Sequence, residues 1–132
     1  MSSPSKVLSI LSLFSQQRPV WQPEEICEVL DFTRATGYRY IKELVDFGLL
    51  KKVSARNYSL GPRIIELDYQ LRGSDPVLLA ADPVMQELST KTGKEVVLTV
   101  LINRKQVIDT HRVYALNPGQ TSVARSRGRQ RP

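Results

Sequence analysis

The chain has 132 residues, of which 41% are hydrophobic and 24% are charged, and its formal net charge at pH 7 is +6. This length suffices for one ordinary domain, or for one small domain and part of another. The sequence has no apolar run long enough for a transmembrane helix, so we expect no membrane partner. The single cysteine, Cys27, excludes an internal disulfide and is typical of the reducing cytoplasm.

Two helices are predicted at the start of the chain. Ser3-Pro4 begins a helix that runs to about Ser15, because serine is a good N-cap and proline suits the first helical position. Its apolar side chains recur at helical spacing between serines, which favours a core helix over a signal peptide. A second helix begins at residues 22–25, where two carboxylates stabilise the first turn, and it places Cys27 on its apolar face.

The next segment predicts a helix-turn-helix followed by a wing. Thr33 is expected to cap a third helix that runs to about Phe47 and ends at Gly48, a residue suited to a left-handed stop. Two helices joined by a short turn, the second of them basic, form a helix-turn-helix. Strands at residues 49–53 and 57–60 then form a hairpin around a basic turn.

Charge is distributed unevenly over this region. Between Thr33 and Arg63 there are seven basic and two acidic residues. The charged residues of the preceding helix are all acidic: Glu24, Glu25, Glu28 and Asp31. We therefore expect a polyanion to dock on the side of the third helix and the wing.

A fourth predicted helix, at residues 63–72, is apolar on more than one side. One face can pack on its own domain, and the surplus predicts a dimer interface with a second subunit. The residues expected at this interface are Ile64, Ile65, Leu67 and Leu71. Residues 73–76 are the expected linker, because they combine glycine, serine, aspartate and proline.

The remainder predicts part of a second domain. We expect a helix at residues 77–90, interrupted at Asp82-Pro83, and strands at 95–102 and 107–113. One helix and one hairpin cannot cover both faces of a sheet, so this domain is expected to be incomplete. The tail, residues 117–132, has few core-forming side chains, and we expect it to be disordered. Its arginines offer non-specific DNA binding or no function, and the second interpretation is favoured.

Three segments of the chain resemble consecutive parts of the IclR-type bacterial transcriptional regulators. These segments are ATGYRYIKELVDFGLLKK, YSLGPRIIEL and PVMQELSTKTGKEVVLTVL, in that order. The resemblance implies an α+β protein: a winged helix-turn-helix at residues 1–61, a linker helix and linker at 62–76, and the start of a GAF-like α/β effector domain at 77–116. It also implies a dimeric repressor or activator of double-stranded DNA, controlled in the full-length family by a small metabolite, often an organic acid.

The sequence departs from the family pattern in two ways. It ends far short of a full effector domain, so we expect this chain not to bind the metabolite. Gly37 occupies a helix position where the family has a larger apolar residue. A glycine there costs about 1 kcal/mol of helix stability, although it can allow close packing.

The face expected to contact DNA follows from a helical wheel of the third helix. Ile41, Leu44, Val45 and Gly37 point inward on this wheel, and a recognition helix enters the major groove with its N-terminal end first. Thr36 and Arg39 are therefore expected at base edges, with Arg39 on guanine O6 and N7. Arg34 and Tyr40 are expected to contact phosphates. For Tyr38, packing within the protein and contact with DNA are both open. The complete predicted set is Arg34, Ala35, Thr36, Tyr38, Arg39, Tyr40, Lys42, Lys52, Arg56 and Asn57.

Alternatives remain open for several of these residues. Arg39 could instead be a solvated position paired with Glu43. At most one of the neighbouring lysines Lys51 and Lys52 should face DNA, because side chains alternate along a strand. The only histidine, His111, has no partners at metal-ligand spacing and is interpreted as a strand residue.

Two functional classes other than a regulator are alternatives for this sequence. Some small-molecule methyltransferases begin with a similar winged-helix dimerisation domain, but they need a glycine-rich cofactor loop that does not follow here. A winged-helix module for protein–protein contact would not need the basic turn. No catalytic residue, cofactor or metal is predicted, since the serines lack the context of a nucleophile.

Overall fold

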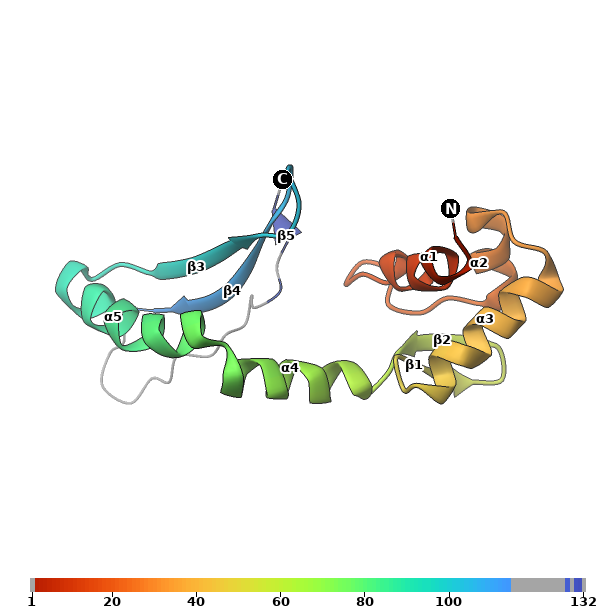
Figure 1. Ribbon diagram of the computed structural model, residues 1–132, viewed down its shortest axis with the longest axis horizontal. Coiled ribbons are helices and arrows are strands. Elements are labelled where there is room, and N and C mark those ends of the chain that lie inside the picture. Colours follow the sequence, from red (N-terminus) through yellow and green to blue (C-terminus); the bar gives the residue numbers. More distant parts are fainter. Residues whose placement is uncertain (1, 115–127, 129, 132) are drawn as a thin grey trace. The chain divides into compact units, whose positions relative to one another are not determined.

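The computed structural model describes residues 2–114, 128, 130 and 131, and the chain divides into two compact units at residues 1–70 and 71–132 (Figure 1). In that described part, none of the helices combines the length and hydropathy of a membrane-spanning segment. The two units are described in turn.

The first unit contains four helical segments and a two-stranded antiparallel sheet before the start of α4. They are α1 (Ser3–Ser9), the 3₁₀ helix η1 (Ile10–Leu13), α2 (Pro23–Leu30), α3 (Arg34–Asp46), β1 (Leu50–Ser54) and β2 (Asn57–Leu60). The first helix is shorter than the prediction to Ser15, because its last turn tightens to 3₁₀ geometry, as helix ends often do. Ser2, one residue before the predicted start, caps it by accepting a hydrogen bond from the Ser5 backbone.

The core of the first unit joins all of these elements. Its buried side chains are Ile10, Phe14, Trp21, Ile26, Tyr40, Ile41, Leu44 and Leu50. Trp21 also links the hairpin to the helices, because its backbone N–H and C=O bond to Tyr58 at 3.0 and 2.9 Å. The wing is thus attached to the helical body through main-chain hydrogen bonds.

Two positions of this unit require glycine, one because of a close approach and one because of its backbone conformation. A Cβ on Gly37 would overlap the Cys27 sulfur, so glycine lets α3 lie close to α2. The expectation that Gly37 permits close packing is confirmed. Gly48 has φ 75° and ends α3 in the left-handed conformation, as predicted.

The second unit contains one long helix and a three-stranded antiparallel sheet. After α4 (Arg63–Ser74) come α5 (Pro76–Thr92), β3 (Val96–Leu101), β4 (Val107–Val113) and β5 (Gln130–Arg131), and the strand order is β3-β4-β5. The helix α5 packs against β3 and β4, and it contributes Leu78 and Met85 to a small core with Val113 (Figure 1).

Two expectations about the second half are wrong. The predicted linker at residues 73–76 is almost absent, because α4 continues through Ser74 and Asp75 alone precedes α5, accepting a hydrogen bond from Val77 N–H at 3.0 Å. The predicted interruption at Asp82-Pro83 does not occur, since α5 continues through Pro83. Of the tail, for which disorder is the prediction, the structure describes a short strand in which Gln130 and Arg131 pair with Ile108 and Val107. Residues 117–127, 129 and 132 of that tail lie outside the described residues.

Side-chain contacts fix α5 on the sheet. His111 on β4 approaches Asp82 on α5, with 2.6 Å between Nε2 and Oδ1. On the same strand, Asp109 is fully buried and accepts a hydrogen bond from Arg112 at 3.0 Å. His111 thus lies on a strand, as predicted, and contacts a carboxylate that the sequence analysis had not linked to it.

Candidate nucleic-acid interface

The turn between α2 and α3 sets the start of the predicted recognition helix. Asp31 takes a left-handed conformation with φ 58° and ends α2. Thr33 then caps α3 as predicted, its side-chain oxygen accepting a hydrogen bond from Thr36 N–H at 3.2 Å. The two helices therefore meet at a turn of three residues, which is the geometry of a helix-turn-helix.

The predicted DNA-binding residues of α3 divide into exposed and buried groups. Exposed side chains are those of Arg34, Ala35, Tyr38, Arg39 and Lys42, and Thr36 is half-buried. The exception is Tyr40, which is only 7% exposed and packs edge-on against Phe32 with ring centroids 5.4 Å apart. The predicted phosphate contact from Tyr40 is therefore corrected: its side chain belongs to the core.

Tyr38 connects the recognition helix to the acidic helix α2. Its hydroxyl donates a hydrogen bond to Glu24 Oε1 at 2.5 Å, and the Arg34 guanidinium lies 5.4 Å from its ring centroid. The hydrogen bond from Tyr38 lowers the pKa of Glu24, and the positive charges of Arg56 and Arg34 lower it further. The same bond raises the pKa of Tyr38, so that both groups keep the protonation state that supports the contact at neutral pH.

A groove separates α3 from the wing. It has a volume of about 460 Å³ and is lined by Tyr38, Arg39, Ile41, Lys42, Val45, Lys52 and Tyr58. Lys52 and Tyr58 are cross-strand partners in the β1–β2 register. Lys51, which is paired with Ser59, is not among the lining residues, as expected from the alternation of side chains along a strand.

The wing tip carries two further predicted residues. Arg56 is exposed in the turn between the strands. Asn57 is half-buried and its side-chain amide donates to Ser54 Oγ at 2.6 Å, which orders the turn. Tyr58 was missed by the sequence analysis, although the hairpin register opposite Lys52 could have indicated it.

The residues predicted for a dimer interface lie on α4. Ile65 is 72% exposed, Leu67 45% and Leu71 54%, and Ile64 is half-buried. Tyr69, which was not in the predicted set, is also 72% exposed. A helix with this many exposed apolar side chains has surface that is normally covered by another element.

Reactive and charged side chains of the described residues occupy different places. No group of three side chains able to hold a metal ion occurs in the described ranges. Burial raises the pKa of the Cys27 thiol, assisted by the negative charge of Glu24, so this thiol is protonated at neutral pH and weakly nucleophilic. Cations, by contrast, gather where α3 faces the wing.

Comparison with protein families gives a match that lies within the unit that carries this groove. Residues 3–54 match the model of the IclR helix-turn-helix domain. A comparison with curated proteins finds no significant match.

Solved structures extend the likeness to the second unit. A protein of Silicibacter sp. TM1040 assigned to the IclR regulators is 28% identical, with a TM-score of 0.72 over 95% of this chain and 50% of its own. An IclR-family regulator from Brucella abortus has a TM-score of 0.81 at 22% identity, over 100% of this chain and 49% of its own. An IclR homolog from Microbacterium hydrocarbonoxydans, solved with 4-hydroxybenzoate, has a TM-score of 0.67 at 22% identity, over 99% and 53%.

These comparisons decide between the classes weighed from the sequence. The matched structures are IclR regulators and not methyltransferases, and their fold is the predicted α+β fold with an N-terminal winged helix-turn-helix. The chain spans about half the length of these solved proteins. The helix-turn-helix of this chain thus matches the IclR domain, and the chain as a whole is similar in fold to IclR regulators.

Proposed function

We propose that this chain is a sequence-specific DNA-binding transcriptional regulator acting on double-stranded DNA in the cytoplasm. The observation that carries the proposal is the groove between α3 and the wing, which is lined by Arg39 and Lys42 of α3 and by Lys52 of the wing. Cations held on one face release counterions from a phosphate backbone, which gives salt-dependent affinity for DNA. No catalytic role is proposed for any residue.

Within this function, the residues of α3 and the wing take different parts. Arg39 and Thr36 read base edges in the major groove, Arg39 through its two-pronged donor geometry. Arg34, Lys42, Lys52 and Arg56 contact the backbone, and Arg56 at the wing tip is also placed for the minor groove. Ala35, Tyr38 and Asn57 lie beside these contacts. The DNA-binding domain is proposed as residues 1–61, followed by the linker helix.

We propose that the protein binds its operator as a homodimer or a higher oligomer through the exposed apolar side chains of α4. A dimer presents two recognition helices to half-sites about 10 base pairs apart, or a multiple of that distance. The support is the exposure of Ile65, Leu67 and Leu71 on one short helix. The position of the operator decides whether the protein represses or activates transcription.

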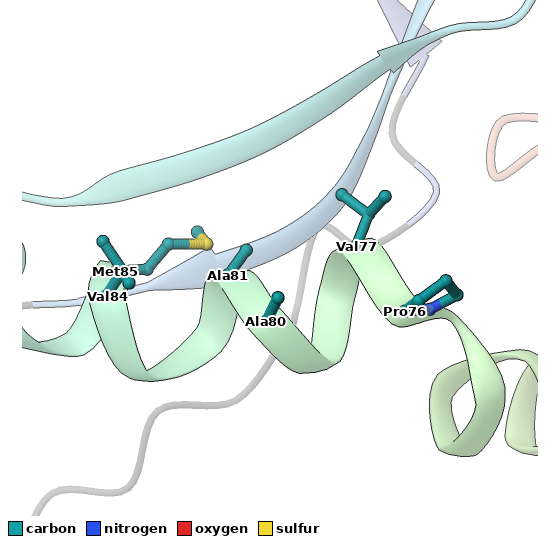
Figure 2. A pocket seen from close by; sticks show the side chains of 6 residues that line it. All are labelled: Pro76, Val77, Ala80, Ala81, Val84 and Met85. Atoms are coloured by element: carbon teal, nitrogen blue, oxygen red, sulfur yellow. The ribbon is translucent and has the colours of Figure 1, made fainter.

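A small organic acid is the proposed effector of full-length regulators of this type, by analogy with the homolog solved with 4-hydroxybenzoate. We propose that the present 132-residue chain does not bind such an acid by itself. Figure 2 shows a hollow on α5 lined by apolar side chains: Pro76, Val77, Ala80, Ala81, Val84 and Met85. A carboxylate needs a cation or several hydrogen-bond donors, and this lining supplies no such side chain.

The test is a fluorescence-anisotropy titration with two labelled duplexes. One is an operator selected from a randomised library, and the other has a mixed sequence. We expect the logarithm of affinity to fall linearly with the logarithm of salt concentration, and the operator to bind at least about 10³-fold tighter than the mixed sequence. Affinity that does not depend on salt, or an equal affinity for every sequence, would reject the proposal.

A further inference from the structure

We propose that the groove between α3 and the wing holds one segment of DNA backbone, with a single phosphate bound between Lys42 and Lys52 and the adjoining deoxyribose against Tyr58. This inference rests on the proposed DNA-binding function and adds to it a specific backbone site. It also assigns a role to Tyr58 and excludes Lys51 from the contact.

The wing supplies one wall of this groove through the register of its two strands. Lys52 and Tyr58 are directly opposite each other, so both side chains lie on the same face of the hairpin. Tyr58 is held in place because its main chain bonds to Trp21 in both directions. Lys51 is paired with Ser59 in the neighbouring row and lies on the other face.

The recognition helix supplies the opposite wall. Tyr38, Arg39 and Lys42 lie along the rim, and Ile41 and Val45 form an apolar floor. Ile41 is 3% exposed and belongs to the core of the unit, so the floor is fixed. The groove therefore has a rigid apolar base between cationic edges.

The chemistry of this lining fits a sugar–phosphate chain. A deoxyribose presents an apolar face that can lie on aliphatic and aromatic carbon, and each phosphate carries one negative charge that a lysine ammonium can contact. An acidic peptide would supply the charge as well. Backbone is favoured because Arg39 belongs both to this rim and to the helix face proposed to read bases, so one DNA strand can satisfy both.

The first experiment compares neighbouring lysines that differ only in the face they occupy. We expect the double change Lys42→Gln/Lys52→Gln to reduce the slope of log affinity against log salt by about 0.9 on a mixed-sequence duplex, because one phosphate contact is lost. Each single change should reduce the slope by less, because the remaining lysine still contacts that phosphate. The matched control, Lys51→Gln, removes the same charge from the other face and should leave the slope unchanged.

The second experiment asks whether Lys42 and Lys52 share one phosphate. Neutral methylphosphonates are placed singly along the selected operator, and each variant is titrated against the set. The same single substituted position should weaken the wild type most and should have a smaller further effect on both Lys42→Gln and Lys52→Gln. Tyr58→Phe keeps the ring and should retain wild-type affinity, whereas Tyr58→Ser should weaken binding with an unchanged salt slope, its fold checked by circular dichroism.

The outcomes separate this inference from the proposed function. Equal changes in slope for Lys51→Gln and Lys52→Gln, or different methylphosphonate positions for Lys42 and Lys52, overturn the groove site while leaving DNA binding intact. A poly-glutamate peptide that binds as tightly as the duplex at the same salt concentration also overturns it, in favour of a peptide site. A wild-type protein that fails to bind DNA overturns both.

Discussion

The hydroxyl of Tyr38 on the recognition helix donates a 2.5 Å hydrogen bond to the carboxylate of Glu24 in the first turn of α2. Two helices that share a buried core are thereby also joined at their exposed edges. The contact lies beside Arg34 and within the electrostatic reach of Arg56, both proposed to contact DNA. The acidic helix therefore has a definite role beside the cationic surface, because it orders a side chain of the recognition helix.

The first prediction concerns this hydrogen bond and pH. Tyr38→Phe should lower the melting temperature at neutral pH, because the link between α2 and α3 is lost. The pKa of Glu24 in the folded protein is below its ordinary value. The contribution of this carboxylate to stability is therefore complete when the pH is above the ordinary pKa, and it is lost as the pH falls through the lowered pKa. The difference between wild type and Tyr38→Phe should therefore shrink in acid.

Thermal melts from acidic to neutral pH measure this effect. The control is Glu28→Gln, which neutralises another exposed acid on α2. Its effect on the melting temperature should be the same whether or not the Tyr38 hydroxyl is present. At alkaline pH the Tyr38 hydroxyl matters instead, because its pKa in the folded protein is raised. Its contribution to stability is complete when the pH is below the ordinary pKa, and it is lost as the pH rises through the raised pKa. A difference between wild type and Tyr38→Phe that is constant across the acidic range would contradict the role of Glu24.

The second prediction concerns the contact of α2 and α3 at Gly37. Gly37→Ala should destabilise the protein by about 1–3 kcal/mol, the range for overpacking a core, because the added methyl group overlaps the Cys27 sulfur. Urea unfolding gives the free energy. The double variant with Cys27→Ala should recover much of the loss, since the overlapping atom is removed.

Gly73 provides the matched control for Gly37. It also lies in a helix, but a Cβ there meets no atom within 4 Å. Gly73→Ala should be neutral or stabilising by about 0.5–1 kcal/mol, the ordinary helix preference for alanine. If Gly37→Ala proves as stable as Gly73→Ala, the close approach of the two helices is not as described.

The third prediction separates base reading from backbone contact. Arg39→Ala should weaken operator binding by about 1–3 kcal/mol and mixed-sequence binding by less, because a bidentate guanine contact is lost. Arg56→Ala should weaken both duplexes similarly and flatten the salt dependence. Titrations of both variants on both duplexes measure this, and equal losses on the two duplexes for Arg39→Ala would show that Arg39 holds only backbone.

The fourth prediction concerns assembly through α4. Ile65 and Tyr69 are each 72% exposed. Replacing both with glutamate should convert a dimer into a monomer and weaken operator binding, because two charges enter an apolar interface. Sedimentation or light scattering measures the mass. Glu66→Gln on the same helix is the control and should remain dimeric, whereas a wild type that is monomeric at micromolar concentration, with and without DNA, would rule out the interface.

The fifth prediction concerns the relative stability of the two units. Among the described residues, eight hydrophobic side chains are buried in the first unit and three in the second, namely Leu78, Met85 and Val113. A smaller core leaves more backbone open to local unfolding. Amide hydrogen exchange should therefore be much faster at residues 77–113 than at 6–60. Similar protection in both, or a rise in melting temperature with a small carboxylic acid, would show a better-formed second unit than proposed.

Local sequence signals determined much of the first unit. Thr33 and Gly48 delimit α3 because a side-chain oxygen at the start and a left-handed glycine at the end act within a few residues. The alternation of side chains likewise allowed at most one of Lys51 and Lys52 to face DNA. The winged helix-turn-helix and its resemblance to IclR regulators could be predicted because these signals follow one another along the chain and none of them depends on distant contacts.

Tertiary structure decided what depends on residues far apart in the chain. Tyr40 is as polar and aromatic as Tyr38, and only the packing of Phe32 against its ring assigns one to the core and the other to the surface. Local preference would end the helix at Pro83, but α5 continues through this residue because the sheet packed against α5 holds the helix. The groove and its Tyr58 depend on the main-chain pairing with Trp21. Local preferences amount to about 1 kcal/mol or less for most residues and about 3 kcal/mol for a proline in a helix, and in this structure burial and long-range pairing override them where the two conflict.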